Sequence, residues 1–276
     1  MRGIDLHLHT TASDGSNRPE EVVQMAAAAE LRAIAITDHD NTRGIRAAML
    51  EGERRGVEVV PGIELSTAYL GMEVHILGYY IDPAADSLAD LLTWALTERE
   101  QRNRRIVAAL QQAGVEITME EVREKFPDTV LGRPHLGMVM AEKGYVQDVR
   151  QAFREYLGKG GRCYIPKVNQ PVERAVERIL QAGGLPVLAH PYQYELDEPG
   201  LRKLISHMKG LGCVGMECVY SKYTPEQSQG LLDLAEEYGL IPTGGSDYHG
   251  LSKPDIHVGD VRAPYGYLEQ LKAARQ

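Results

Sequence analysis

Residues that can bind a metal ion recur along this chain in short clusters, and most of them follow an apolar, strand-like segment. In Ile4-Asp5-Leu6-His7-Leu8-His9, apolar and polar residues alternate as in a β-strand, which places both imidazoles on one face. Two imidazoles on one face can bind one ion. The candidate metal ligands are nine residues: His7, His9, Asp14, His39, Glu64, His75, His190, Asp247 and His249.

Strand-like and helix-like segments alternate along most of the chain, which predicts an α/β fold with a parallel sheet or barrel. In a parallel barrel the loops after the strands gather at one rim, where such folds place their chemistry. His9, His39, Glu64, His190 and Asp247 each fall at the end of an expected strand, so we expect them to converge there. The expected strands include residues 4–9, 33–37, 57–63, 74–81, 185–189 and 214–219.

The alternation breaks between residues 85 and 163, where the pattern is helical and rich in charge. We therefore expect a barrel formed by residues 1–84 and 164–276, with residues 85–163 inserted as a helical unit that caps the active site. The length of 276 residues suits one α/β barrel with such an insertion.

The overall charge limits the class of ligand. A formal net charge of −9 argues against an extended nucleic-acid surface, but it is compatible with a small phosphorylated ligand in a local positive pocket.

Three scattered cysteines offer no disulfide framework, and no apolar stretch reaches the roughly 18 residues of a membrane helix. We expect a soluble, cytoplasmic protein.

Each candidate ligand alone has an ordinary structural explanation. His75 inside an apolar strand suits a core histidine, Glu64 suits a helix cap or an arginine partner, and Asp14 suits a tight turn. The metal hypothesis is favoured because the alternative requires all of these ordinary explanations to be true at the same time. His207 and His257 lack a comparable setting, and we expect ordinary structural roles for them.

The donor set bounds the metal. Imidazole and carboxylate without thiolate suit manganese, iron, zinc or cobalt and disfavour calcium, and manganese is our first expectation. Nine ligands are too many for one ion, so two or three divalent ions are expected, with Glu64 as the natural bridge. Metal pairs about 3.5–4 Å apart are a standard device for hydrolysing phosphate esters.

Together, the clusters resemble the PHP (polymerase and histidinol phosphatase) metal-dependent phosphoesterases. The motifs that carry the resemblance, in the family's order, are His7-Leu8-His9, Ser13-Asp14-Gly15, Thr37-Asp38-His39, Pro61-Gly62-Ile63-Glu64, His75, Ala189-His190-Pro191 and Gly245-Ser246-Asp247-Tyr248-His249. The resemblance implies a distorted seven-stranded barrel that holds up to three metals.

The same resemblance implies how the ligands divide among the metals. The first metal would be bound by His7, His9, Glu64 and Asp247. Glu64 would bridge to a second metal, bound also by His75 and His190. The third metal would be bound by Asp14, His39 and His249.

Within that family, the inserted segment resembles the 3′,5′-nucleoside bisphosphate phosphatases, whose close relatives also act as 5′→3′ exonucleases on short RNA. The segments concerned are residues 98–103, Gly132-Arg133-Pro134-His135 and Tyr156-Leu157-Gly158.

A solvated basic helix face is the commoner explanation for arginines three residues apart, such as Arg99 and Arg102. The resemblance instead favours phosphate binding by Arg99, Arg102 and Arg133, with His135 as a further donor. Arg133 is the strongest candidate because the Gly-Arg-Pro loop fixes its backbone and a guanidinium binds phosphate bidentately. Arg104, Arg105 and Lys167 are expected at the surface.

The sequence therefore predicts a phosphoric ester hydrolase that acts on a phosphomonoester of a small nucleotide. The expected reaction removes the 3′-phosphate of adenosine 3′,5′-bisphosphate to give AMP. Asp247 would orient the attacking water, and Arg133 would neutralise charge on the phosphoryl oxygens. The pattern nominates no leaving-group acid.

Three alternatives remain. The same metals would serve a 5′→3′ exonuclease that acts on short 5′-phosphorylated RNA. An amidohydrolase shares the His-x-His opening on a barrel strand, but that family often bridges its metals with a modified lysine where this chain offers Glu64. A non-catalytic metal-binding module would not need the arginine-bearing loop.

Overall fold

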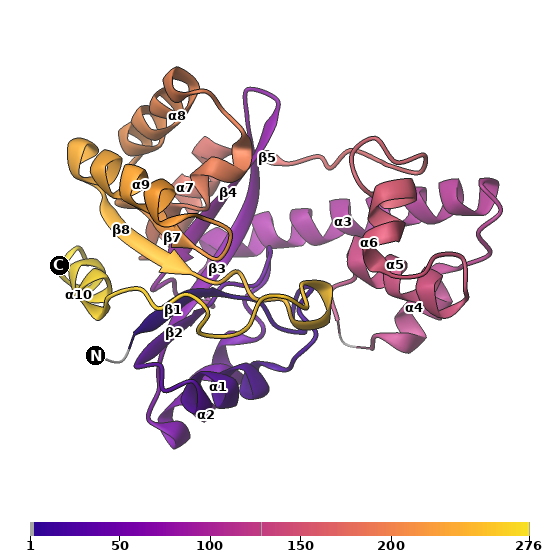
Figure 1. Ribbon diagram of the computed structural model, residues 1–276, viewed down its shortest axis with the longest axis horizontal. Coiled ribbons are helices and arrows are strands. Elements are labelled where there is room, and N and C mark those ends of the chain that lie inside the picture. Colours follow the sequence, from indigo (N-terminus) through magenta and orange to yellow (C-terminus); the bar gives the residue numbers. More distant parts are fainter. Residues whose placement is uncertain (1–2, 128, 276) are drawn as a thin grey trace.

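The computed structural model describes residues 3–127 and 129–275, and it shows a nearly closed barrel of seven strands beside a group of helices (Figure 1). Around the barrel the strands follow the order β1-β2-β3-β4-β6-β7-β8, and the short β5 pairs with β3. This arrangement confirms the distorted seven-stranded α/β barrel. The strands are β1 (Ile4–Leu8), β2 (Ala33–Ile36), β3 (Glu58–Tyr69), β4 (Met72–Tyr79), β5 (Gln170–Pro171), β6 (Leu185–Leu188), β7 (Gly215–Tyr220) and β8 (Ile241–Gly245).

Ten α-helices occur in the described residues, and none of them is long and apolar enough to cross a membrane. Helices α1 and α2 lie on one side of the barrel, and α7, α8 and α9 cover another side (Figure 1). The helices are α1 (Pro19–Ala28), α2 (Ile45–Arg55), α3 (Asp86–Gln112), α4 (Met119–Lys125), α5 (Arg133–Glu142), α6 (Val149–Ala152), α7 (Val172–Gln181), α8 (Glu198–Leu211), α9 (Pro225–Tyr238) and α10 (Tyr265–Ala273). A π-helical turn, Phe153–Leu157, continues α6.

The barrel closes where β8 meets β1. The backbone N–H of His9 donates to the Tyr248 carbonyl at 3.0 Å, and the N–H of Asp247 donates to the His7 carbonyl at 2.9 Å. A Cβ at Gly245 would lie 2.3 Å from the Cβ of His7, so this approach requires glycine. The closure therefore brings the first and the last cluster of candidate ligands side by side, although about 240 residues separate them in the sequence.

The parallel sheet expected from the sequence is wrong at β4, which runs antiparallel to both β3 and β6. Only Leu70 and Gly71 join β3 to β4, and both have a positive φ (48° and 81°), as in a tight hairpin turn. Two residues cannot make the crossover that a parallel pair needs. Because β4 is reversed, its first half lies at the rim where the parallel strands end, and this places His75 there.

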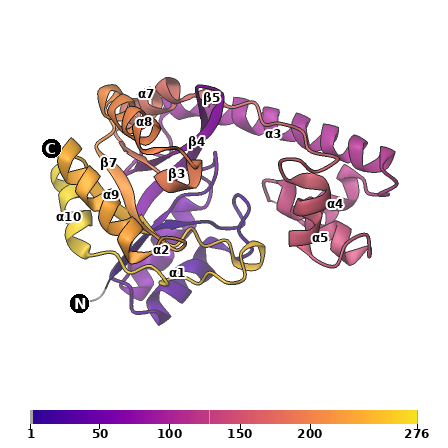
Figure 2. The same cartoon turned by 45° about the horizontal axis from the view of Figure 1, so that its top comes forward.

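The inserted helices have a hydrophobic core of their own. Helix α3 extends for 27 residues away from the barrel, and α4, α5 and α6 pack at its far end (Figures 1 and 2). Buried residues between Ile106 and Cys163 form this core, among them Leu110, Ile117 and Leu157. A separate core supports our proposal that residues 85–163 are a distinct unit on the barrel.

Candidate functional site

The first strand delivers two imidazoles to the rim of the barrel. His7 lies in β1, His9 directly follows it, and both side chains are completely buried. The distances from His7 Nε2 and His9 Nε2 to Glu64 Oε2 are both 3.2 Å. Asp247 Oδ1 lies 3.7 Å from His7 Nε2 and 3.3 Å from His9 Nε2. One donor atom from each of these four residues lies within 4.8 Å of the others, a spacing that a metal ion can span.

Glu64 presents one carboxylate oxygen to each of two groups of histidines. Its Oε2 faces His7 and His9, whereas its Oε1 lies 2.7 Å from His75 Nδ1 and 3.1 Å from His190 Nε2. A carboxylate shared in this way is suited to bridging two ions. Glu64 lies within β3, just beyond the four residues that pair with β2, rather than at the end of the strand.

A third group lies on the other side of His9. Donor atoms of His9, Asp14, His39 and His249 lie within 4.8 Å of one another, and His249 Nε2 is 3.3 Å from Asp14 Oδ1. His39 also lies 3.0 Å from Glu64 Oε2, so it stands between this group and the carboxylate bridge. All nine candidate ligands therefore come together at one rim.

The residues present fit a set of divalent cations. Several buried nitrogen and oxygen atoms that face one another here have no hydrogen-bond partner among the described residues: His7 Nε2, His9 Nδ1, His9 Nε2, His39 Nδ1 and Glu64 Oε2. Buried polar atoms are normally satisfied, and leaving them bare costs free energy. A cluster of imidazole nitrogens and carboxylate oxygens without partners is the donor set that manganese, iron or zinc would complete.

Asp247 is fixed in one orientation by its neighbours. Its backbone adopts the left-handed region with φ of 57°, which is costly for aspartate and occurs where a side chain must be aimed. Its Oδ2 accepts hydrogen bonds from Tyr220 Oη at 2.6 Å and Lys253 Nζ at 2.5 Å, so Oδ1 is left to face the histidines. Although burial raises the pKa of Asp247, the charges of Lys253 and His249 hold it well below its ordinary value.

A second layer of carboxylates supports the ligands, and the sequence analysis missed it. Glu217 Oε1 lies 3.0 Å from His7 Nδ1, and its Oε2 accepts from the backbone N–H of His190 at 2.9 Å. A proton on Nδ1 leaves Nε2 of His7 free to bind metal. Asp38 accepts hydrogen bonds from Thr10 and Ser13, which hold the loop that carries Asp14. The only sequence signal for Glu217 is a lone carboxylate in the otherwise uncharged strand β7.

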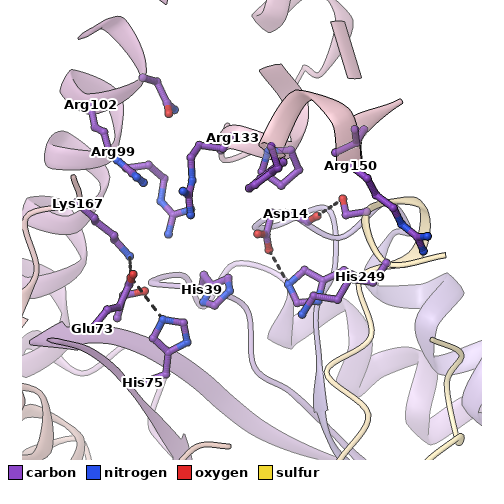
Figure 3. A pocket seen from close by; sticks show the side chains of 18 residues that line it. Asp14, His39, Glu73, His75, Arg99, Arg102, Arg133, Arg150, Lys167 and His249 are labelled. Carbon is purple, nitrogen blue, oxygen red and sulfur yellow. Dashed lines mark hydrogen bonds and ion pairs between the residues drawn. The ribbon is translucent and has the colours of Figure 1, made fainter. Parts of the chain in front are cut away.

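The metal-capable cluster forms one wall of a cavity of about 520 Å³. Figure 3 shows His39, His75 and His249 on one side, with Arg99, Arg102 and Arg133 reaching in from the inserted helices on the other. Asp14, Lys167 and Lys253 line it as well. The cavity thus places a cationic wall opposite the candidate metal centre.

Two of these guanidinium groups have no carboxylate partner among the described residues. Arg102 Nε donates to the Ile165 carbonyl at 2.8 Å, and Arg133 Nη1 donates to the Leu157 carbonyl at 3.2 Å. Burial, and then the charge of Arg133, lower the pKa of Arg102 to about 10, so it stays charged at neutral pH. Two partly desolvated cations side by side form a strong site for an anion.

The structure corrects the expectation that Lys167 lies at the surface. Its side chain is only 17% exposed, and its Nζ lies 3.4 Å from Asp40 Oδ2. Arg99 Nη2 donates to the same oxygen at 2.9 Å. Burial raises the pKa of Asp40, but Lys167 and Arg99 outweigh it and bring the pKa to about 2. Asp40 therefore offsets part of the charge of Arg99, which is less available to substrate than Arg102 and Arg133.

His135 does not line the cavity, contrary to its expected role as a phosphate donor. Its Nδ1 accepts from the backbone N–H of Gly132 at 3.0 Å, and its ring packs edge-on against Phe126. The side chain is 3% exposed and caps the start of α5 instead. This cap fixes the loop from which Arg133 enters the cavity.

Comparison with known proteins identifies the family. A family model for the PHP domain matches residues 5–183, which is more than half of the chain. This protein belongs to the PHP family. A metal-dependent phosphoesterase structure from Bifidobacterium adolescentis superposes with a TM-score of 0.90 at 28% identity, covering 99% of this chain and 96% of that one. This PHP protein is accordingly a phosphoric ester hydrolase whose fold and family imply divalent metals.

Three relatives of this PHP protein are named for different phosphate esters. The 3′,5′-nucleoside bisphosphate phosphatase of Chromobacterium violaceum is 33% identical, with 94% of this chain and 91% of the relative aligned. The 5′-3′ exoribonuclease Rnm of Salmonella typhimurium is 34% identical, with 89% and 84% aligned. The phosphoribosyl 1,2-cyclic phosphate 1,2-diphosphodiesterase of Eggerthella lenta is 36% identical, with 92% and 97% aligned.

Proposed function

We propose that this enzyme hydrolyses the 3′-phosphate of adenosine 3′,5′-bisphosphate to give AMP and inorganic phosphate. The observation that carries the proposal is the two-sided cavity. One wall belongs to the cluster of nine candidate metal ligands, of which Asp14, His39, His75 and His249 line the cavity. The other wall holds Arg102 and Arg133, two partly desolvated cations without carboxylate partners among the described residues. A substrate with two phosphates matches both walls at once, whereas a simple monophosphate leaves one wall unused. The name of the Chromobacterium violaceum relative supports this substrate.

Divalent ions bound here would supply Lewis acidity and lower the pKa of water to near neutrality. Glu64 would link two ions, and the remaining histidines and carboxylates would complete the three groups described above. Asp247 orients the attacking water through Oδ1, because Tyr220 and Lys253 already occupy Oδ2. The Tyr220 hydroxyl stays protonated as a donor, since burial and then Asp247 raise its pKa.

Cations of this chain stabilise the charge that develops during the reaction. Arg133 and Arg102 bind the phosphate that is not cleaved and fix the nucleotide in the cavity. Lys253 lines the cavity and uses one of its three N–H donors on Asp247, so the others are available to the leaving oxygen. We assign Lys253 as the group that offsets negative charge on that oxygen.

Cleavage of short RNA from its 5′ end is the second candidate, and a neighbouring cavity favours it. This cavity of about 350 Å³ shares Arg99 with the first and is lined also by Arg43, Arg123 and Phe126. Arginines beside an aromatic ring suit the backbone and base of further nucleotides. The exoribonuclease relatives support this candidate.

Turnover with manganese separates the candidates. We compare kcat/KM for three substrates. They are adenosine 3′,5′-bisphosphate, a 5′-phosphorylated RNA ladder and phosphoribosyl 1,2-cyclic phosphate, the cyclic diester in the name of the Eggerthella lenta relative. The proposal expects the bisphosphate to give the highest value. A higher value for the RNA would favour the exonuclease, and a higher value for the cyclic diester, or no turnover of any substrate, would contradict both candidates.

The arginine wall is tested by Arg133→Ala. We expect it to abolish measurable turnover while metal content stays at that of the parent enzyme, because Arg133 enters the cavity from the inserted helices, opposite the candidate ligands (Figure 3). Arg104→Ala is the matched control, since Arg104 is exposed, pairs with Glu100 and does not line this cavity. Unchanged turnover in Arg133→Ala would remove Arg133 from the mechanism.

A further inference from the structure

A π-helical turn borders the cavity, and the chemistry proposed above does not use it. The turn covers Phe153–Leu157 and is closed by a hydrogen bond of 2.7 Å from the Gly158 N–H to the Phe153 carbonyl. Turns of this kind are rare and are found frequently at functional sites. Here the turn determines where Phe153, which lines the cavity, presents its ring.

The position of Phe153 is fixed from both sides. A Cβ at Gly158 would lie 2.6 Å from the Phe153 carbonyl oxygen, so only glycine allows the turn to close. Tyr156 and Leu157 are buried in the core of the inserted helices and anchor the turn from below. Phe153 itself is half-buried, which leaves part of its ring facing the cavity.

Phe153 belongs to a small apolar wall in a cavity that is otherwise polar. Pro134, Val149 and Phe153 are the apolar side chains among its lining residues, and the remainder are charged, polar or glycine. The guanidinium carbon of Arg133 lies 5.3 Å from the centre of the Phe153 ring. An aromatic face is thus placed directly beside the cation that we assign to a phosphate.

We propose that Phe153, flanked by Pro134 and Val149, is the platform on which the base of the nucleotide stacks. The proposal rests on the function proposed above and adds the part of the substrate that neither metals nor arginines recognise. Every base has an aromatic face, so stacking on one ring favours nucleotides over sugar phosphates without strong selection among bases. The platform distinguishes this cavity from one built for a ribose phosphate alone.

The test compares a nucleotide with the sugar phosphate that carries a hydroxyl in place of the base. Dissociation constants of AMP and ribose 5-phosphate are measured by calorimetry on the manganese-loaded enzyme, beside turnover of adenosine 3′,5′-bisphosphate. The parent enzyme is expected to bind AMP about tenfold or more tightly than ribose 5-phosphate, the discrimination that one stacked base provides. Phe153→Leu keeps the apolar volume but removes the ring, and it is expected to lower this ratio about tenfold with unchanged ribose 5-phosphate binding.

Two further variants complete the design. Phe153→Tyr keeps the ring and is expected to keep the ratio. Tyr267→Leu removes a half-buried aromatic ring on α10, which does not line this cavity, and is also expected to keep the ratio. Equal affinities in the parent, or an unchanged ratio in Phe153→Leu, would overturn the platform. The expected ratios without turnover of the bisphosphate would support the platform while removing the proposed reaction.

Discussion

At the scale of single residues, the site depends on side chains that hold the candidate ligands in place. Glu217 contacts His7 and the backbone of His190, whereas Lys253 and Tyr220 hold one oxygen of Asp247. Such partners orient ligands and tune their basicity, and their loss commonly lowers metal affinity or activity. Lys253 and Glu217 each give a prediction, one for the reaction and one for metal affinity.

Lys253→Met tests the assignment of charge on the leaving oxygen. We expect kcat to fall about 10–100-fold, because an electrostatic donor to the reacting group is lost, with metal content unchanged. Lys222→Met is the control, since Lys222 is exposed and does not line the cavity. Loss of metal in Lys253→Met, or an unchanged kcat, would show that Lys253 acts only through Asp247 or not at all.

Glu217→Gln tests the support behind His7. Glutamine has one acceptor oxygen where Glu217 uses two, so His7 or His190 loses its partner. We expect the affinity for Mn²⁺ to fall about tenfold or more. Glu236→Gln, on the exposed face of α9, is expected to match the parent enzyme. Metal titrations followed by calorimetry give both values, and equal affinities in the two variants would contradict the role of Glu217.

The candidate ligands were predictable from sequence because their pattern is local: alternation in β1 and polar residues directly after apolar runs. The supporting residues were not. Lys167 and Asp40 are 127 residues apart, and nothing near Lys167 in the sequence indicates a buried partner. The segment Gly132-Arg133-Pro134-His135 predicts phosphate binding by His135, but the helix cap that His135 forms instead depends on the geometry of the turn.

At the scale of the elements, the hairpin between β3 and β4 is what brings His75 to the centre. The sequence signal was present in the short Leu70-Gly71 link, but the surrounding strand–helix rhythm favoured a parallel arrangement. The inserted helices were recognisable by their pattern. Their position over the rim was not, because it depends on where the 27 residues of α3 end.

Leu110→Ala tests whether the inserted helices act separately from the metal centre. Leu110 is completely buried in their core, and its truncation costs about 2–5 kcal/mol of unfolding free energy. Because Arg133 and Phe153 belong to this unit, we expect KM for the bisphosphate to rise while metal content stays at the parent value. Leu204→Ala makes the same change in the core of the barrel and is expected to destabilise that part instead. A parallel loss of metal in Leu110→Ala would contradict the separation.

At the scale of the whole molecule, an acidic protein holds a cationic cavity. The net charge of −9 disfavours long polyanions, whereas Arg102 and Arg133 attract a small anion locally. The cavity of about 520 Å³ has the size of a site for one small molecule. Charge and volume together favour a mononucleotide over an extended nucleic acid.

The central claim is that a multinuclear metal centre performs phosphoester hydrolysis, and a metal titration tests it most directly. Metal-free enzyme is titrated with Mn²⁺, and bound equivalents and phosphate release from adenosine 3′,5′-bisphosphate are measured in the same samples. We predict two or three equivalents per chain, with activity appearing only after more than one is bound, and no activity in Glu64→Gln. Full activity at one bound equivalent of Mn²⁺, or saturation of metal binding below two equivalents per chain, would contradict the account.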